Sequence, residues 1–152
     1  YKTDNLCIIV DIDGTLADVN HRLHYLNKET NQKPDWGSFF NAMTEDTVRE
    51  EIKSLVQDSY EGYDVILVSG RPDSHRHETE EWLCNNGIKY NALYMRQEND
   101  FRSDIDVKQE ILDLYLPKNK IEVVIDDRRC VIDNWRKNGL KVINVGGEDN
   151  DF

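Results

Sequence analysis

Short runs of apolar residues alternate along the chain with longer stretches in which apolar residues recur every three or four positions. Short continuous runs are typical of buried strands, and a spacing of three or four is typical of amphipathic helices. The sequence therefore predicts strands at residues 6–10, 63–68, 92–95, 120–125 and 140–145. It predicts helices at residues 47–60, 73–86, 103–115 and 128–138. Strands that alternate with helices predict an α/β fold, a parallel sheet with helices on both faces.

Polar residues follow directly after several of the predicted strands. Asp11 and Asp13 follow the first strand, and Ser69 follows the second. Asp126 and Asp127 follow the fourth. Open α/β sheets bind their ligands at the edge where the carboxyl ends of the strands lie. We therefore expect these side chains to meet in one site at that edge.

The first strand end carries the sequence Asp-Ile-Asp-Gly-Thr at residues 11–15. Asp11 can attack a phosphorus atom and form an aspartyl-phosphate, while Asp13 can protonate the leaving oxygen and later take a proton from water. Gly14 leaves room for the backbone to approach a ligand, and Thr15 offers a hydroxyl and an N–H group to phosphate oxygens. For an Asp-x-Asp pair alone, a turn at a strand end is the more common explanation. The glycine and threonine that follow favour a phosphate site here.

The segment between the first strand and the first predicted helix is polar apart from a group of aromatic residues, Trp36, Phe39 and Phe40. We expect residues at about 20–46 to form a short insert that covers the site. A small hydrophobic cluster beneath a loop is the plain alternative.

The composition bounds the class of protein. A length of 152 residues suits one domain with one core, and a start at Tyr1 without methionine leads us to expect one domain of a longer protein. Three cysteines, far apart in the sequence, fit reduced thiols in a cytoplasmic protein, and no apolar run is long enough to cross a membrane. The net charge of −11 lacks the basic footprint of most nucleic-acid-binding proteins. This negative charge is a weaker objection than its size suggests. Carboxylates that hold Mg²⁺ count as negative in the total but not in the working site, and arginines near the site could make a local positive pocket.

The ordered set of strand ends resembles the motifs of the haloacid dehalogenase superfamily of phosphotransferases. This resemblance implies a Rossmann-like sheet with strand order 3-2-1-4-5, and it implies that the insert is a cap that screens substrates. It implies that Ser69 hydrogen-bonds the phosphoryl group that is transferred. It also implies that Lys108, in the helix predicted at 103–115, neutralises the phosphate and holds the nucleophile.

The same resemblance implies Mg²⁺ as the cofactor, a hard cation that takes oxygen ligands and few protein contacts. The expected metal-binding residues are Asp11, Asp13, Asp126 and Asp127. Of the last two, we expect Asp126 to contact the ion directly. We expect Asp127 to act through water, or by holding Lys108 or an arginine.

A second run of residues is more specific. Tyr94-Met95-Arg96, followed by Asp100, Arg102, Asp104 and Lys108, is similar to the 3′-phosphatase domains of bacteriophage-type polynucleotide kinase-phosphatases. The likeness covers nearly the whole chain and implies substrate-binding roles for Thr15, Arg22, Gly70, Arg71, Arg96, Arg102 and Asp104. It implies Mg²⁺-dependent removal of 3′-phosphate from RNA or DNA ends, a step of nucleic-acid end repair. It also implies a kinase domain in the same full-length protein, and this chain holds no G-x-x-x-x-G-K-[ST] loop of its own.

Other functions compete with this interpretation. A small-molecule phosphatase of the same superfamily would share its general motifs. A non-enzymatic receiver domain also groups an Asp, a Ser or Thr, a Lys and an acidic pair around Mg²⁺. There, however, the acidic pair precedes the phosphorylated Asp in the chain, and here it follows. An inactive scaffold ranks lowest, because no motif is degraded.

Overall fold

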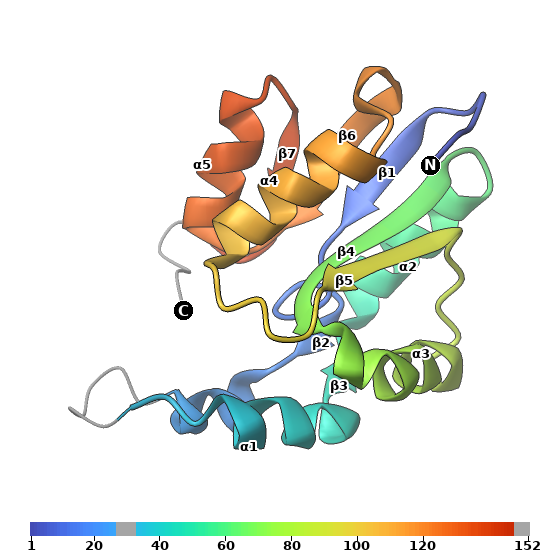
Figure 1. The fold of residues 1–152 in the computed structure, drawn as a ribbon. Helices are drawn as coiled ribbons and strands as arrows, with labels where there is room; N and C mark the ends of the chain where they lie inside the picture. Colours follow the sequence, from blue (N-terminus) through green and yellow to red (C-terminus); the bar gives the residue numbers. More distant parts are fainter. Residues whose placement is uncertain (27–32, 148–152) are drawn as a thin grey trace.

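A five-stranded parallel sheet forms the centre of the computed structural model, which describes residues 1–26 and 33–147 (Figure 1). Its strands are β1 (Cys7–Val10), β4 (Asp64–Pro72), β5 (Ala92–Arg96), β6 (Ile121–Asp126) and β7 (Val142–Asn144). They lie in the order β5-β4-β1-β6-β7, so β1 is central and pairs with β4 and β6. Numbered along the chain this is 3-2-1-4-5, which confirms the predicted order and the Rossmann-like α/β fold.

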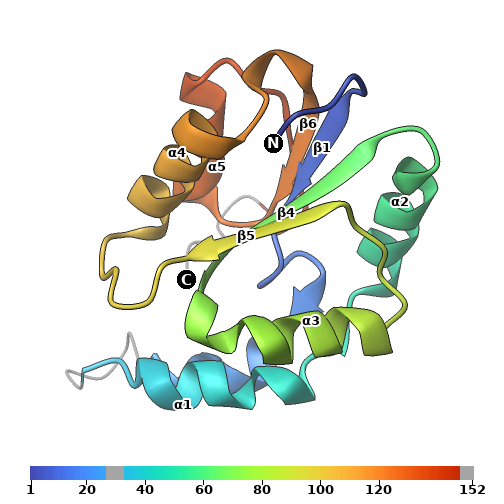
Figure 2. The same cartoon turned by 45° about the vertical axis from the view of Figure 1, so that its right-hand side comes forward.

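Helices cover both faces of the sheet, as Figures 1 and 2 show from two directions. On one face, α2 (Glu50–Tyr60) and α3 (Arg76–Asn85) pack against Ile8 and Val10 of β1. On the other face, α4 (Asp104–Tyr115) and α5 (Arg129–Lys137) pack against Cys7 and Ile9. Successive residues of a strand point to opposite faces, so β1 contributes to both cores and is wholly buried. This burial fixes the position at which Asp11 leaves the sheet.

Short elements fill the chain between β1 and α2: β2 (Ala17–Asp18), η1 (Asn20–Tyr25), α1 (Trp36–Asn41), η2 (Ala42–Glu45) and β3 (Thr47–Val48). Here η denotes a 3₁₀ helix. Strands β2 and β3 form a separate antiparallel pair. Helix α1 lies beyond the carboxyl ends of the sheet strands (Figures 1 and 2). The predicted insert at about 20–46 holds η1, α1 and η2 and lies between β2 and β3; its residues 27–32 lie outside the described part.

Several predicted element bounds were wrong. The helix predicted at 47–60 begins only at Glu50, because Thr47 and Val48 pair with β2, and Leu55 within it is 37% exposed. The helix predicted at 73–86 begins with a 3₁₀ turn, η3 (Asp73–His75). Tyr115, which the spacing directs inward, is 42% exposed at the end of α4.

The second sheet strand also runs further than predicted. β4 continues to Pro72, so residues 69–71 belong to the strand and not to a loop. The short third strand was expected near an edge, and β5 is indeed an edge strand. Among the described residues, no helix combines the length and the apolar character needed to cross a bilayer.

Candidate active site

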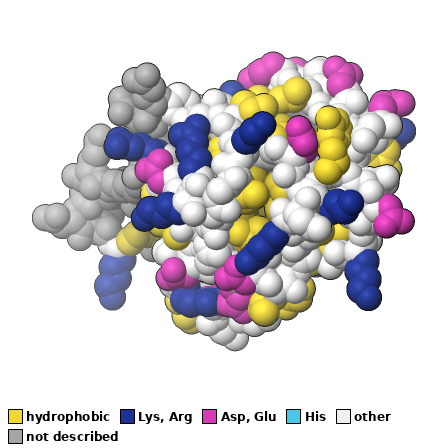
Figure 3. Space-filling model, turned by 90° about the horizontal axis from the view of Figure 1, so that it is seen from above, with side chains coloured by type: hydrophobic (Ala, Val, Ile, Leu, Met, Phe, Trp, Pro, Cys, Tyr) yellow, Lys and Arg dark blue, Asp and Glu magenta, His cyan; other side chains and the backbone are white. Residues whose placement is uncertain are grey.

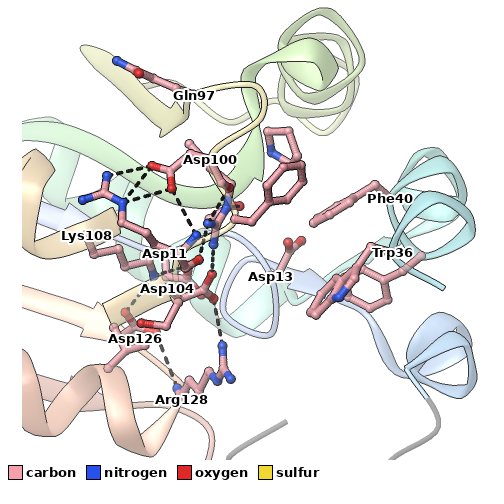
Figure 4. Close-up of a pocket in the computed structure, with 18 of the residues that line it drawn as sticks. Asp11, Asp13, Trp36, Phe40, Gln97, Asp100, Asp104, Lys108, Asp126 and Arg128 are labelled. Atoms are coloured by element: carbon pink, nitrogen blue, oxygen red, sulfur yellow. Dashed lines mark hydrogen bonds and ion pairs between the residues drawn. The ribbon is translucent and has the colours of Figure 1, made fainter. Parts of the chain in front are cut away.

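A cavity of about 440 Å³ opens at the carboxyl ends of β1, β4 and β6 (Figure 4). Carboxylates and a lysine line one side of it, and the aromatic residues of α1 line the other. The predicted functional residues among its lining are Asp11, Asp13, Gly70, Arg96, Arg102, Asp104, Lys108, Asp126 and Asp127. The strand-end residues thus meet at one site, as the parallel topology requires.

Lys108 connects two of the buried carboxylates. Its Nζ lies 2.8 Å from Oδ1 of Asp11 and 3.1 Å from Oδ2 of Asp126. Burial opposes the charge on the lysine, but the two carboxylates outweigh this effect and raise the pKa of the ammonium group. The indole N–H of Trp135 also donates to Oδ2 of Asp126, at 3.1 Å. Lys108 is therefore charged and fixed against the carboxylate that follows β1.

Asp11, Asp126 and Asp127 form a buried trio whose oxygen atoms lie within 4.8 Å of one another. Burial raises the pKa of Asp11 well above its ordinary value, and the charge of Asp126 adds to this effect against the opposing charge of Lys108. Burial likewise raises the pKa of Asp127 to about 6. Three carboxylates beside one ammonium leave an excess of two negative charges when all are ionised. That excess matches a divalent cation, and hard oxygen donors suit Mg²⁺, so these residues fit the expected metal.

The backbone turn at Gly14 leaves the space that Asp127 occupies. Gly14 has a φ of +83°, and a Cβ added there would lie 2.0 Å from Oδ2 of Asp127. Only glycine fits both the left-handed conformation and the close approach. Thr15 follows directly, and its hydroxyl lies 3.2 Å from Oδ2 of Asp11 and 3.1 Å from Oδ1 of Asp127. The motif thus packs against the acidic pair after β6.

Asp13 has different neighbours from the trio. Its Oδ1 accepts hydrogen bonds from Nη2 of Arg22 at 2.8 Å, and from Nε and Nη2 of Arg71 at 2.9 and 2.6 Å. Burial alone would raise the pKa of Asp13, but the two guanidinium groups outweigh it and lower the pKa to about 2. The Asp13 carboxylate is not among the trio's oxygens, so its predicted part in metal binding stays a prediction.

Asp46, which was not predicted from the sequence, completes this charge cluster. Asp46 is buried and accepts from Arg22 Nε at 2.9 Å, from Arg22 Nη2 at 2.7 Å and from Arg71 Nη2 at 3.3 Å. Two guanidinium groups thus face two carboxylates, which balances the buried charge. The sequence signal was indirect: two arginines placed in a buried site require acidic partners, and the insert supplies one at its end.

The whole chain was compared with known proteins. Residues 5–152 match the family described as polynucleotide kinase PNKP phosphatase domain. The chain belongs to this family. It is therefore a phosphatase domain of the haloacid dehalogenase class, a phosphoric monoester hydrolase, as its motifs implied.

Solved structures agree with the family assignment. Two chains from structures of a Pnkp1/Rnl/Hen1 complex, which is an RNA repair complex, are each 30% identical to this chain with a TM-score of 0.80. The two matches cover 97% and 99% of this chain. They cover only 45% and 49% of the chains from the complex, so this chain spans less than half of their length. A haloacid dehalogenase-like hydrolase of Streptococcus pneumoniae is 16% identical with a TM-score of 0.62, over 92% of this chain and 84% of that one. It shares the fold.

A Bacteroides thetaiotaomicron enzyme of the haloacid dehalogenase family also shares the fold. It is 13% identical with a TM-score of 0.56, over 95% of this chain and 96% of that one. That structure was solved in complex with magnesium and inorganic phosphate.

The two arginines expected to bind phosphate in this phosphatase domain face elsewhere. Arg22 and Arg71 are fully buried and bind Asp13 and Asp46, so neither lines the cavity directly. Ser69 is also buried, and its Oγ accepts the backbone N–H of Arg71 at 3.1 Å. Their predicted contacts with the phosphate stay predictions.

Arg96 organises the loop after β5 in this phosphatase domain. It donates to the carbonyl of Gly70 at 2.8 Å and to the carbonyl of Asp100 at 3.0 Å, and it forms an ion pair with Asp104. Asp104 also pairs with Arg128 at 2.9 Å. An added Cβ on Gly70 would lie 2.5 Å from Oδ1 of Asp104, so this glycine makes room for the loop contact.

Arg102 is the most exposed of the predicted substrate-binding arginines. It lines the cavity, and its guanidinium group forms ion pairs with Asp100, at 2.7 Å, and with Glu110. Arg102 and Arg96 thus shape the loop at residues 97–103, and contact with substrate stays a prediction for both.

Proposed function

We propose that this domain removes the 3′-phosphate from RNA or DNA ends through an aspartyl-phosphate on Asp11. One observation carries the proposal: Asp11 is held by the buried Lys108, and Asp13, two residues on, is held by two buried arginines. A nucleophile and an acid–base group therefore project into one cavity. Membership of the polynucleotide kinase phosphatase family supports a polynucleotide end as the substrate.

In the first step, an oxygen of Asp11 attacks phosphorus while the bond from phosphorus to the 3′-oxygen breaks. Asp13 donates a proton to that oxygen as it leaves. In the second step, a water oxygen attacks the aspartyl-phosphate, Asp13 takes a proton from the water, and Asp11 is released. Its arginines hold Asp13 as a carboxylate at rest, which suits the second step. For the first step, Asp13 must first receive a proton, and the singly protonated form of the phosphate, whose second pKa is about 6, can pass its proton to Asp13, which then gives it to the leaving oxygen.

Charge neutralisation is the main requirement of phosphoryl transfer. Lys108 supplies a fixed positive charge. Thr15 supplies a hydroxyl group beside Asp11, and Ser69 supplies one from within β4. Mg²⁺, held by the trio of Asp11, Asp126 and Asp127, would supply the remaining positive charge when bound. Of the acidic pair after β6, we propose that Asp126 contacts the Mg²⁺ ion directly. Asp126 also accepts a hydrogen bond from Lys108.

The setting of the domain is part of the proposal. The two similar chains described above come from structures of a Pnkp1/Rnl/Hen1 RNA repair complex, which favours RNA ends as the substrate. This chain spans less than half of each of them. We infer that residues 1–152 are one phosphatase domain, with a cap-like insert at about 20–46. A kinase domain would lie elsewhere in the same cytoplasmic protein.

The test is phosphate release from matched oligonucleotides that carry either a 3′- or a 5′-phosphate, with Mg²⁺ and with chelator. Wild type is compared with Asp11→Asn and with Asp133→Asn, an exposed aspartate of α5 outside the cavity. Release from the 3′ end alone, dependent on Mg²⁺ and lost only in Asp11→Asn, is the expected result. Equal release from both ends, or from free nucleotides only, would keep the phosphatase and exclude the 3′-end specificity. No release from any substrate would indicate a phospho-acceptor module or an inactive scaffold.

A further inference from the structure

Aromatic side chains stand on the far side of the cavity from the carboxylates. Trp36 and Phe40 of α1 and Phe101 of the loop after β5 line the cavity, and we call these three the aromatic wall. Trp36 is 51% exposed and Phe101 is 90% exposed. Large apolar side chains left in solvent around a polar site mark a surface that binds a ligand. The wall is therefore a candidate for contact with the part of the substrate that leaves.

The α1 side of the wall is fixed to the acid–base group. Trp36 and Phe40 stack at 5.8 Å between ring centroids, and the buried Phe39 packs edge-on against both. The guanidinium of Arg22 lies 4.3 Å from the centre of the Phe39 ring and donates to the Phe39 carbonyl at 3.0 Å. Arg22 also holds Asp13. The rings thus keep a constant position relative to the atom that protonates the leaving oxygen.

Phe101 is held outward by hydrogen bonds on either side of it. Arg96 donates to the carbonyls of Asp100 and Arg102, the residues that flank Phe101. Arg102 returns an ion pair to Asp100, and Asn99 takes a left-handed turn with φ of 67°. The exposure of Phe101 is therefore built into a hydrogen-bonded loop.

The order of groups across the cavity places the wall beside the leaving group. In Figure 4, Asp13 lies between the group of Asp11 and Lys108 on one side and Trp36 and Phe40 on the other. The leaving oxygen must lie next to Asp13 while phosphorus lies next to Asp11. The fragment attached to that oxygen therefore extends toward the wall. At a polynucleotide end, this fragment is a sugar with its base.

The charge of the protein favours recognition by stacking over attraction to backbone phosphates. The net charge of −11 opposes attraction of the whole protein to backbone phosphates. The face opposite α1, which looks away from the cavity, has Asp and Glu side chains among its Lys and Arg side chains (Figure 3). Aromatic rings bind bases by stacking, and they tolerate every base because each has a flat π face.

We propose that the aromatic wall stacks on the terminal nucleobase of a 3′-phosphorylated strand, so that a base at the end is required for efficient hydrolysis. This inference rests on the proposed function and adds the group by which the end is recognised. Stacking on one base corresponds to about a 5- to 150-fold advantage in kcat/KM over an end without a base. Because stacking carries no net charge, the advantage should persist when salt is raised.

The test uses two oligonucleotides that end in a 3′-phosphate, one with a normal terminal nucleotide and one with an abasic terminal sugar. Wild type should prefer the end with a base. Trp36→Ala should lose most of that preference by slowing only the substrate with a base, and Trp36→Phe should keep it. Leu114→Ala, an exposed apolar residue of α4 outside the cavity, is the matched control and should behave as wild type.

The outcomes separate this inference from the proposed function. Equal hydrolysis of both ends by wild type would overturn the stacking role and leave the 3′-phosphatase intact. An equal loss on both ends in Trp36→Ala would also overturn it, because it would reveal a purely structural role. Release from neither end, with wild type folded and Mg²⁺ present, would instead overturn the proposed function itself.

Discussion

Asp127→Asn should raise the stability of the domain without Mg²⁺ and reduce the stabilisation that Mg²⁺ brings. Burial raises the pKa of Asp127 from 3.8 to about 6. A carboxyl group whose pKa is higher in the folded state than in the unfolded state stabilises the fold at a pH below both values. This contribution is lost as the pH rises through the pKa of the folded state. At about 1.36 kcal/mol per pKa unit, the shift corresponds to about 3 kcal/mol lost by pH 7.5 without metal. Asparagine never ionises and keeps an oxygen for the Thr15 hydroxyl.

The assay is thermal unfolding in chelator and in Mg²⁺, at pH 4.5 and pH 7.5. For a domain of this size, about 1 kcal/mol moves Tm by roughly 2–4 °C. In chelator at pH 7.5, the variant should therefore unfold about 6–12 °C above wild type, and the gap should narrow at pH 4.5. Mg²⁺ should raise the Tm of wild type more than that of the variant. Asp133→Asn should show no such gap. A variant less stable than wild type in chelator at pH 7.5 would refute the reasoning.

Three further substitutions test other parts of the site. Asp46→Asn leaves two buried guanidinium groups with one carboxylate fewer, and it should lower the free energy of unfolding by about 3–5 kcal/mol in denaturant titrations; a loss below about 1 kcal/mol would contradict this. Gly14→Ala should push Asp127 aside and weaken Mg²⁺ binding about 10- to 100-fold in calorimetry. Gly139→Ala has a similar φ of +81° but no atom within 4 Å of the added Cβ, so an equal loss there would disprove the steric argument. Lys108→Met should abolish phosphate release, and retained turnover would exclude the role of its charge.

The sheet and the strand-end motifs were predictable because their signals are local. Residues 7–10 form an uninterrupted apolar run, and such a run with carboxylates directly after it has few structural solutions. Lys108 was predicted from the resemblance to the haloacid dehalogenase motifs, because by itself it looks like an ordinary helix lysine, and the helix that carries it begins after the Ser103 cap, next to the predicted start. Local patterns thus sufficed for the carboxylates at the strand ends but not for Lys108.

The rest depends on contacts that are remote in the sequence. The sequence alone cannot show that Arg22 is buried, because its partner Asp46 lies on another element. Thr47 and Val48 continue a helical spacing, yet pairing with β2 draws them into a strand. Phe101 is apolar but 90% exposed, in a loop whose flanking carbonyls accept hydrogen bonds from Arg96. In each case a tertiary contact overrides a local preference.

Arg22 joins α1 to Asp13, because it donates one hydrogen bond to the main-chain carbonyl of Phe39 and another to the Asp13 carboxylate. A motion that lifted α1 would break the first of these bonds, so the position of α1 is coupled to the setting of Asp13. A carbonyl is present whatever side chains stand near it. New residues at positions 36 or 40 therefore alter which leaving group fits while the acid–base group keeps its setting. The residues proposed to select the substrate can therefore change without altering the hydrogen bonds that hold Asp13.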